Sequence, residues 1–358
     1  MAHSPYQPAY EFTRGDIVES IHFAAIAVVD VYGNLLAYHG DPNTVTFLRS
    51  TAKPMQALAF VEAGGPKALN LSEKELALIC ASHSGTDDHA LTATSIQQKA
   101  NITETDLQCG VHLPMHKDTA NALRDRGETL TSNRHNCSGK HSGMLAFAKW
   151  KGWPLETYLE CENPLQQLIL QTVSELTDVP VADIHMGTDG CSAPNFAFPL
   201  SNTALALARF ADPSQLSPTR AAACRQITHA MMSHPNMVGG PDRFDTTLMQ
   251  AFGGNLFCKG GAQGYQGIGL MPGLLHAENP FGYATGESPA IGIALKVSDG
   301  NARGSAVEAV ALETLRQIGA LDSAHAAAMQ AFGPHLTVHN WRKLEVGEGR
   351  PSFTLKRP

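Results

Sequence analysis

The sequence predicts an α+β fold, in which strands near both ends of the chain form one sheet and helices from the middle pack against it. Strand patterns occur at 26–38 and 291–297, with a weaker signal over 337–355. Most of the chain between them shows the apolar spacing of helices. The strands lie far apart in sequence, so the sheet is expected to be non-local. No repeat or linker interrupts the chain, which predicts one folded unit over 15–358, with room for an α/β layer and a helical subregion, after a polar tail over 1–14.

The first elements follow from local signals. Residues 26–38 are expected to form two strands around a Gly33-Asn34 turn. Residues 49–62 are expected to form a helix that stops at Gly64-Gly65. The apolar run 76–82 suits either the end of a buried helix or a core strand.

The later elements alternate between helices and polar turns. Residues 136–141 and 189–194 are expected to be turns, and 255–258 a short strand that leads into Lys259-Gly260-Gly261. Further helices are expected over 87–99, 144–150, 164–176, 203–210, 218–233, 302–318 and 323–332.

Composition narrows the class of protein. The chain has 358 residues, of which 43% are hydrophobic, so a sizeable core can be buried. The net charge of −7 and the absence of a basic block argue against a nucleic-acid partner. The N-terminus has no apolar signal segment, and runs such as 24–31 are too short to cross a bilayer. We therefore expect no membrane partner and a cytoplasmic location. There the seven scattered cysteines are thiols, metal ligands or core residues, not a disulfide framework.

The pair Ser50 and Lys53 is the first candidate for chemistry. Three-residue spacing on a helix places both side chains on one face. A serine hydroxyl needs a base to become a nucleophile, and lysine can be that base only as the neutral amine. Pro54 is tolerated in a first helical turn, which puts Ser50 near the positive end of the helix. The alternative is a capping serine followed by a surface lysine, because the pattern alone is common.

Two other segments offer partners for this pair. Ser82 and Ser84 follow a core run and precede Gly85, which suits an active site or a simple turn. Lys259 precedes two glycines that let the backbone approach a ligand, and the segment is similar to the Lys-Thr-Gly element of penicillin-recognising enzymes. A glycine-rich hairpin with a solvated lysine is the alternative.

Two cysteine-containing loops and one arginine loop complete the set. Cys137 and Cys191 lie in polar, glycine-containing loops and are able to share a metal, with His135 and His141 as the obvious extra ligands by chemistry. Their spacing is not a metal motif, so two unrelated thiols are the alternative. Arg243 lies in a glycine-rich loop, where it could bind the carboxylate of a substrate. The alternative is a solvated turn residue.

Together these segments resemble the L-asparaginase II family of the Rhizobium etli type. The resemblance rests on several ordered motifs and spans residues 15–344, nearly the whole chain. The matching motifs are Arg49-Ser-Thr-Ala-Lys-Pro, Ser82-His-Ser-Gly, Asn136-Cys-Ser-Gly-Lys-His-Ser-Gly-Met, Thr188-Asp-Gly-Cys, Gly239-Gly-Pro-Asp-Arg-Phe-Asp-Thr and Lys259-Gly-Gly.

The resemblance implies a fold, an activity and site residues. The fold would be like that of serine β-lactamases and glutaminases, with helices against an antiparallel sheet. The activity would be hydrolysis of L-asparagine to L-aspartate and ammonia, by a homodimer. Two Ser–Lys tandems fall on Ser50 with Lys53 and on Ser82 with Lys259.

The resemblance also implies a zinc ion. The family's zinc ligands fall on Cys137, Lys140 and Cys191, with Asp189 as a nearby carboxylate. Only a neutral lysine amine can bind a metal, so zinc affinity should fall at acid pH. The lysine ligand also displaces the two histidines from that role.

The expected mechanism is a serine acyl-enzyme. Ser50, activated by a neutral lysine, is the preferred nucleophile, and Ser82 with Lys259 relays protons or holds the intermediate. We expect Arg49 or Arg243 to bind the α-carboxylate, and His83 and Asp189 to complete the substrate site. The rival readings are another β-lactamase-like or glutaminase-like amidohydrolase and a non-catalytic protein that binds zinc or an amino acid.

Overall fold

The computed structural model describes residues 4–300 and 306–358. Within them the contacts of the chain group into two compact units, and the single catalytic unit expected over 15–358, with an α/β layer and a helical subregion, stays a prediction. The first contains Met1–Thr46, Phe198–Asp212 and Ala251–Pro358, and the second contains Phe47–Ala197 and Pro213–Gln250. Each unit is assembled from separate stretches of chain. No linker composition marks these changes, which is why the sequence did not reveal the division.

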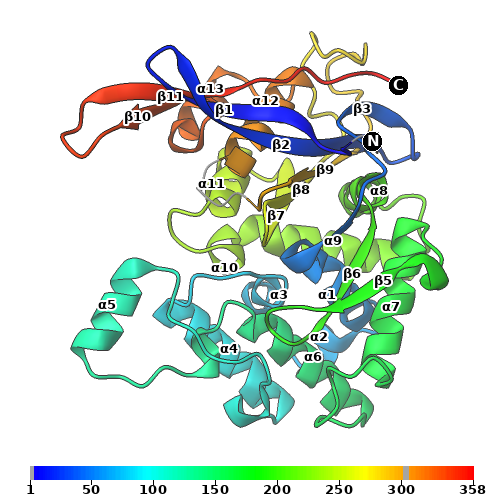
Figure 1. The fold of residues 1–358 in the computed structure, drawn as a ribbon. Helices are drawn as coiled ribbons and strands as arrows, with labels where there is room; N and C mark the ends of the chain where they lie inside the picture. Colours follow the sequence, from blue (N-terminus) through cyan, green and yellow to red (C-terminus); the bar gives the residue numbers. More distant parts are fainter. Residues whose placement is uncertain (1–3, 301–305) are drawn as a thin grey trace. The chain divides into compact units, whose positions relative to one another are not determined.

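The first unit contains an eight-stranded sheet (Figure 1). Its strands run in the order β10-β11-β1-β2-β9-β8-β7, and β3 pairs with β2 beside this path. Each strand is antiparallel to the neighbours with which it pairs. The strands are β1 (Gln7–Arg14), β2 (Ile17–Asp30), β3 (Leu35–His39), β7 (Leu256–Gly261), β8 (Tyr265–Leu270), β9 (Ile291–Val297), β10 (Leu336–His339) and β11 (Glu345–Pro351).

The two ends of the chain meet in this sheet. Tyr10 of β1 is paired with Pro351 of β11, so the non-local sheet is confirmed. The expected N-terminal tail is wrong for residues 7–14, because they form β1 between β2 and β11. The rest of that prediction, residues 1–3, lies outside the described residues.

Helices cover the central strands of the first unit. All six residues of β8 are buried, so both faces of the sheet are covered there. The helices α8 (Leu200–Ala211) and α12 (Ala306–Gln317) both pack against β8 and β9. The helix predicted over 302–318 matches α12, and its first residues lie outside the described part. After α12 in the sequence come the short helix α13 (Ser323–Ala328) and the 3-10 turn η5 (Gln330–Phe332).

The second unit is mainly helical. Its central helices α1, α3 and α6 pack on one another and on α4, α7 and α9, and a small sheet has the order β4-β6-β5. The helices are α1 (Lys53–Glu62), α2 (Gly65–Ala68), α3 (Glu73–Ile79), α4 (Asp87–Ala100), α5 (Lys117–Asp125), α6 (Ser138–Lys151), α7 (Pro164–Thr177), α9 (Pro218–Ser233), α10 (Pro235–Val238) and, at its end, α11 (Phe244–Ala251). The strands and 3-10 turns are β4 (Val45–Phe47), β5 (His185–Thr188), β6 (Pro194–Pro199), η1 (Arg49–Ala52), η2 (Glu104–Asp106), η3 (Ser132–Arg134) and η4 (Val181–Asp183).

The α+β class is confirmed, and so are most of the helices. Those predicted over 87–99, 164–176 and 218–233 match α4, α7 and α9 closely. The run 76–82, left open between helix and strand, ends helix α3 at Ile79. Among the described residues no helix is both long and apolar enough to cross a lipid bilayer.

The turn expected over 136–141 is wrong, because α6 begins at Ser138. Its small residues serve close packing against α3. A Cβ atom on Gly139 would lie 2.2 Å from the backbone oxygen of Leu78, and one on Gly143 would lie 2.7 Å from a side-chain carbon of Ile79. Glycines that usually signal a turn allow two buried helices to touch in this case.

Candidate active site

Ser50 and Lys53 lie at the start of α1, as the position of Pro54 predicted. Ser50 is 9% exposed and belongs to the turn η1, while Lys53 is the first residue of α1 and is 1% exposed. The backbone N–H of Lys53 donates to the backbone oxygen of Ser50. One short turn therefore sets the position of both residues relative to the helix.

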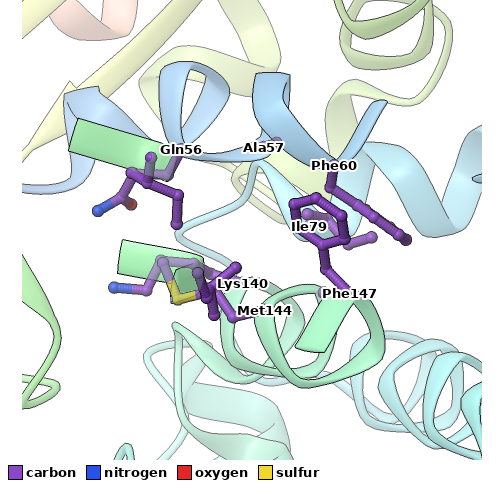
Figure 2. A pocket seen from close by; sticks show the side chains of 10 residues that line it. Gln56, Ala57, Phe60, Ile79, Lys140, Met144 and Phe147 are labelled. Atoms are coloured by element: carbon purple, nitrogen blue, oxygen red, sulfur yellow. The ribbon is translucent and has the colours of Figure 1, made fainter. Parts of the chain in front are cut away.

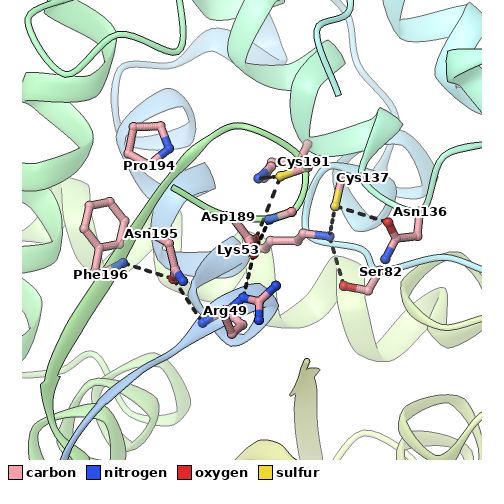
Figure 3. Close-up of polar contacts among 12 residues, drawn as sticks. Arg49, Lys53, Ser82, Asn136, Cys137, Asp189, Cys191, Pro194, Asn195 and Phe196 are labelled. Carbon is pink, nitrogen blue, oxygen red and sulfur yellow. Dashed lines mark hydrogen bonds and ion pairs between the residues drawn. The ribbon is translucent and has the colours of Figure 1, made fainter. Parts of the chain in front are cut away.

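The buried amino group of Lys53 contacts three acceptors from other segments of the second unit. Its Nζ atom donates to the backbone oxygen of Ala81 at 2.5 Å and to Oγ of Ser82 at 2.9 Å. It also lies 3.1 Å from Sγ of Cys137 (Figure 3). Three motifs that are separate in sequence thus meet at one nitrogen atom.

The segment from Ser82 to Gly85 is held by backbone contacts on both sides. The N–H of Ser82 donates to the oxygen of Val238, and the N–H of His83 donates to the oxygen of Asn136. Oγ of Ser84 donates to the oxygen of Gly239 at 2.8 Å. The adjacent Gly240 has φ of +114°, and a Cβ atom there would lie 2.5 Å from Oγ of Ser84, so only glycine fits.

His83 is fully buried, and both of its ring nitrogens have partners. The N–H of Gly85 donates to Nδ1, so the proton lies on Nε2, which donates to Oγ of Ser138 at 2.9 Å. Burial lowers the pKa of His83 well below its usual value, so the ring is neutral. Direct substrate binding by His83 stays a prediction that requires one of these bonds to break.

Cys137 and Cys191 approach each other and two lysines. The contact with Cys191 holds the pKa of Cys137 well below its usual value, although burial opposes this, and Lys53 and Lys140 add to the effect. The same contact, with burial, raises the pKa of Cys191. Nζ of Lys140 donates to Sγ of Cys191 at 2.9 Å. The two sulfur atoms therefore interact with each other and with the amino groups of two buried lysines.

Lys140 itself is held as an ammonium ion in this arrangement. Burial alone lowers its pKa, but the neighbouring Cys191 and Cys137 outweigh that effect and raise the pKa above its usual value. The donor set fits a zinc ion, because two thiols and an amine converge from the start of α6 and from the loop that contains Cys191. A metal held there would have to displace the proton of Lys140.

The two histidines near the cysteines differ in their partners. Nδ1 of His135 accepts from the N–H of Cys137, which fixes the entry to α6. Nδ1 of His141 is 2.6 Å from the hydroxyl of Tyr158, while its Nε2 is buried without a hydrogen-bond partner among the described residues. Burial lowers the pKa of His141 to about 4, although Cys191 acts in the opposite direction. The side chain of His141 thus lies beside Cys191 and interacts with it.

A small apolar cavity is lined by residues of α1, α3, α6 and α7. Figure 2 shows the carbon chain of Lys140 along this cavity, with its nitrogen pointing away from Phe60 and Phe147. Because its lining is mostly apolar, this cavity does not suit a charged ligand. Its lining is Gln56, Ala57, Phe60, Ile79, Lys140, Gly143, Met144, Phe147, Leu165 and Ile169.

Arg49 forms an ion pair beside the cysteine cluster. Its Nε atom lies 2.6 Å from Oδ1 of Asp189, and both side chains are largely buried. Burial raises the pKa of Asp189, but Arg49, Lys140 and the N–H of Gly190 outweigh it and lower the pKa. Asp189 is therefore a carboxylate, and a substrate carboxylate at Arg49 would share the guanidinium group with it.

Arg49 also has an unusual backbone. Its φ of +52° lies in the left-handed region, which costs energy for any residue except glycine. Oδ1 of Asn195 accepts from the N–H of Arg49 at 3.0 Å and from the N–H of Phe196 at 3.0 Å. Asn195 thus holds the strained residue that precedes Ser50.

The two remaining predicted residues are Arg243 and Lys259, of which Lys259 belongs to the first unit. Arg243 is exposed, and its Nη1 is 3.7 Å from the sulfur of Met115. Lys259 is fully buried on β7 of the first unit, where its Nζ donates to the backbone oxygen of Gly260. Lys259 lies within the strand, not after it as expected. Its pairing with Ser82 of the second unit stays a prediction.

Sequence reasoning missed three residues that support the cluster. Asn195 carried one weak signal, since asparagine is uncommon in strands, but β6 itself was not predicted. Asn136 places its Oδ1 3.4 Å from Sγ of Cys137. His112 accepts from the N–H of Asn136 and packs on the ring of His135, with centroids 4.3 Å apart. Nothing in the sequence marks His112, because its role depends on a long-range contact.

A comparison with known families decides the identity of the chain. The model of the family described as L-asparaginase II matches residues 10–351. The chain belongs to the L-asparaginase II family. It is therefore an amidohydrolase that acts on a small molecule. The L-asparaginase II family named from its motifs is confirmed, and the Rhizobium etli type stays a prediction. No curated protein matches the sequence.

Among solved structures, a Bacillus glutaminase determined in the presence of 4.3 M NaCl is similar. It has 11% sequence identity and a TM-score of 0.32, with 86% of this chain and 88% of the glutaminase covered. At this score the similarity carries no argument about the site of the L-asparaginase II chain.

Proposed function

We propose that the chain hydrolyses L-asparagine to L-aspartate and ammonia through a serine acyl-enzyme, as in the Rhizobium etli type of the family. The observation that carries the proposal is the buried Nζ of Lys53. It lies 2.9 Å from Oγ of Ser82, on a lysine three residues after Ser50. A buried lysine beside a hydroxyl group is the arrangement that Ser–Lys catalysis requires. Family membership supplies the amidohydrolase class.

In the proposed reaction, Oγ of Ser50 attacks the side-chain amide carbon of asparagine, and its proton passes to neutral Lys53. Lys53 and Ser82 then return a proton to the leaving nitrogen, so that ammonia departs and an aspartyl ester remains on Ser50. Water hydrolyses the ester, which releases aspartate and regenerates the hydroxyl. Arg49 or Arg243 binds the α-carboxylate, and Asp189 the α-ammonium group.

The reverse assignment of the serines has an observation in its favour. A neutral Lys53 has two N–H bonds and one lone pair. With the N–H bonds on Ala81 and Cys137, the lone pair faces the hydroxyl of Ser82. This arrangement would make Ser82 the attacking group and Ser50 the relay. The reaction class stays the same.

We also propose that Cys137, Lys140 and Cys191 hold a zinc ion. When bound, zinc would supply a positive charge that orients a polar substrate. The residues themselves supply two thiols and an amine, and Asp189 lies beside them, with Cys191 Sγ 3.8 Å from its Oδ2. A homodimer and a cytoplasmic location, both suggested by the sequence, belong to the same proposal.

The test is ammonia release from L-asparagine by purified variants. S50A should lose at least about 10³-fold in kcat/KM, and S82A and K53R about 10²-fold or more. Removal of the nucleophile should slow the reaction more than removal of a group that only transfers a proton. S174A removes a hydroxyl of the same unit that bonds the oxygen of Val179, and should keep full activity.

Parallel assays separate the rival functions. Glutamine and a chromogenic cephalosporin should be poor substrates compared with L-asparagine. Faster turnover of either would replace the proposed substrate. Folded protein that hydrolyses none of the three compounds, with or without zinc, would favour the non-catalytic binding protein.

A further inference from the structure

Three side chains of the first unit form a cluster that the proposed function does not use. The cluster consists of His276, Asp322 and His325. One ligand atom from each residue lies within 4.8 Å of the other two. Two imidazoles and a carboxylate are donors that first-row divalent metals prefer.

Two nitrogen atoms of this cluster lack a hydrogen bond. Nε2 of His276 and Nδ1 of His325 are shielded from solvent and have no hydrogen-bond partner among the described residues. Oδ1 of Asp322 lies 2.9 Å from Nδ1 of His325, and Oδ2 lies 4.0 Å from Nε2 of His276. These are ion pairs only if the rings are protonated. A cation between the three groups would satisfy both nitrogens and the carboxylate with neutral rings.

The cluster is held in place by contacts that do not involve its ligand nitrogens. Asp322 caps helix α13, where its Oδ1 accepts from the backbone N–H of His325 at 2.8 Å. The ring of His325 stacks on Phe252, with centroids 4.0 Å apart and planes 9° from parallel. The N–H of His276 donates to the oxygen of Gly319, and Nδ2 of Asn279 donates to the oxygen of His276. Ligands fixed in advance bind with a smaller loss of entropy.

We propose that His276, Asp322 and His325 bind one divalent first-row cation, for which zinc is the reference ion. The ligand atoms are Nε2 of His276, Nδ1 of His325 and an oxygen of Asp322. The side chains of His276, His325 and Asp322 are 45%, 19% and 41% exposed, so water completes the coordination. The ion joins the segment that contains His276 to helix α13, and its role is to stabilise the first unit.

The experiment counts zinc ions bound to full-length protein after dialysis, at neutral pH. The double variant C137S/C191S removes the thiols of the other proposed site and should still bind one equivalent. H276N or H325N in that background should weaken zinc binding at least about tenfold. Losing a metal ligand costs more affinity than losing a residue that only hydrogen-bonds to a ligand, and the latter already costs about that much. H229N is the matched control, because His229 also lies beside a carboxylate, that of Glu73, and should change nothing.

Cobalt gives a second readout. Co²⁺ at a histidine–carboxylate site produces a visible spectrum without the thiolate charge-transfer band that cysteine ligands add. If C137S/C191S does not fold, H276N/H325N is made in the wild-type background. It should bind one equivalent of metal fewer than wild type, and its cobalt spectrum should lose only the bands that do not come from thiolate ligands. Unchanged stoichiometry and affinity in the histidine variants would overturn the proposal, and so would a cobalt spectrum from thiolate ligands alone.

Discussion

At the scale of single residues, the hydrogen bonds of Lys53 set the chemistry. As an ammonium group it has three N–H bonds, and it has three acceptors, on Ala81, Ser82 and Cys137. Activation as a base means that one of these bonds reverses. The hydroxyl of Ser82 is the acceptor best able to become a donor, because a carbonyl cannot donate and the pKa of Cys137 is held well below its usual value. Ser82 is thus the serine whose hydroxyl contacts Nζ of Lys53.

Asn195 is a positioning residue at the same scale. N195A should lower kcat by about 10–100-fold, because the strained Arg49 loses its hydrogen bond and Ser50 shifts from its place. N195D keeps an acceptor oxygen and should fall between wild type and N195A. Steady-state kinetics with L-asparagine measure this effect. N43A, at an exposed asparagine that bonds Ser201, is the control. Full activity in N195A would show that the backbone of Arg49 does not depend on Asn195.

At the scale of elements, periodicity identified most helices, while packing decided the rest. The helix α9 was predicted with its actual bounds, since its apolar spacing and Pro218 are local signals. The strands β5 and β6 were missed because they are short and gain their structure from each other. The start of α6 was missed because Gly139 and Gly143 favour a turn by local signals. They are needed for close packing against α3, and the local sequence does not reveal that contact.

The link between α3 and α4 gives a prediction about pH. Burial raises the pKa of Glu75, but hydrogen bonds from Lys99, Ser72 and Ser95 outweigh it and hold the pKa below its ordinary 4.5. Such a carboxyl group contributes stability that is complete above pH 4.5 and is lost as the pH falls through the folded-state pKa. E75Q should lower the free energy of unfolding by about 2 kcal/mol at pH 7.

The difference between E75Q and wild type should shrink below pH 4.5. Urea denaturation at a series of pH values measures both effects. E19Q, at an exposed pair with Arg14, should change stability by less than about 0.5 kcal/mol at every pH. If the difference in the free energy of unfolding between E75Q and wild type is independent of pH, the charge of Glu75 is not the source of its contribution to stability.

At the scale of the whole molecule, the motifs identified the L-asparaginase II family correctly, while the roles of the site residues stay predictions. The sequence placed Ser50, Lys53, Ser82, Cys137 and Cys191 in one site, and the structure brings Lys53 together with Ser82 and Cys137. The division into two units was not predictable, because each unit is built from separate stretches of chain. Lys259 lies in the first unit, so its predicted pairing with Ser82 has to be tested by kinetic measurements on variants.

The central claim is that an aspartyl ester of serine forms during hydrolysis of L-asparagine. Trapping with hydroxylamine tests it most directly, because an acyl-enzyme transfers its acyl group to this nucleophile. We predict that wild-type protein with L-asparagine and hydroxylamine forms aspartyl hydroxamate while ammonia release continues undiminished, and that S50A forms none. Hydroxamate formation by S50A but not by S82A would assign the ester to Ser82. Ammonia release by wild type without hydroxamate would contradict the account.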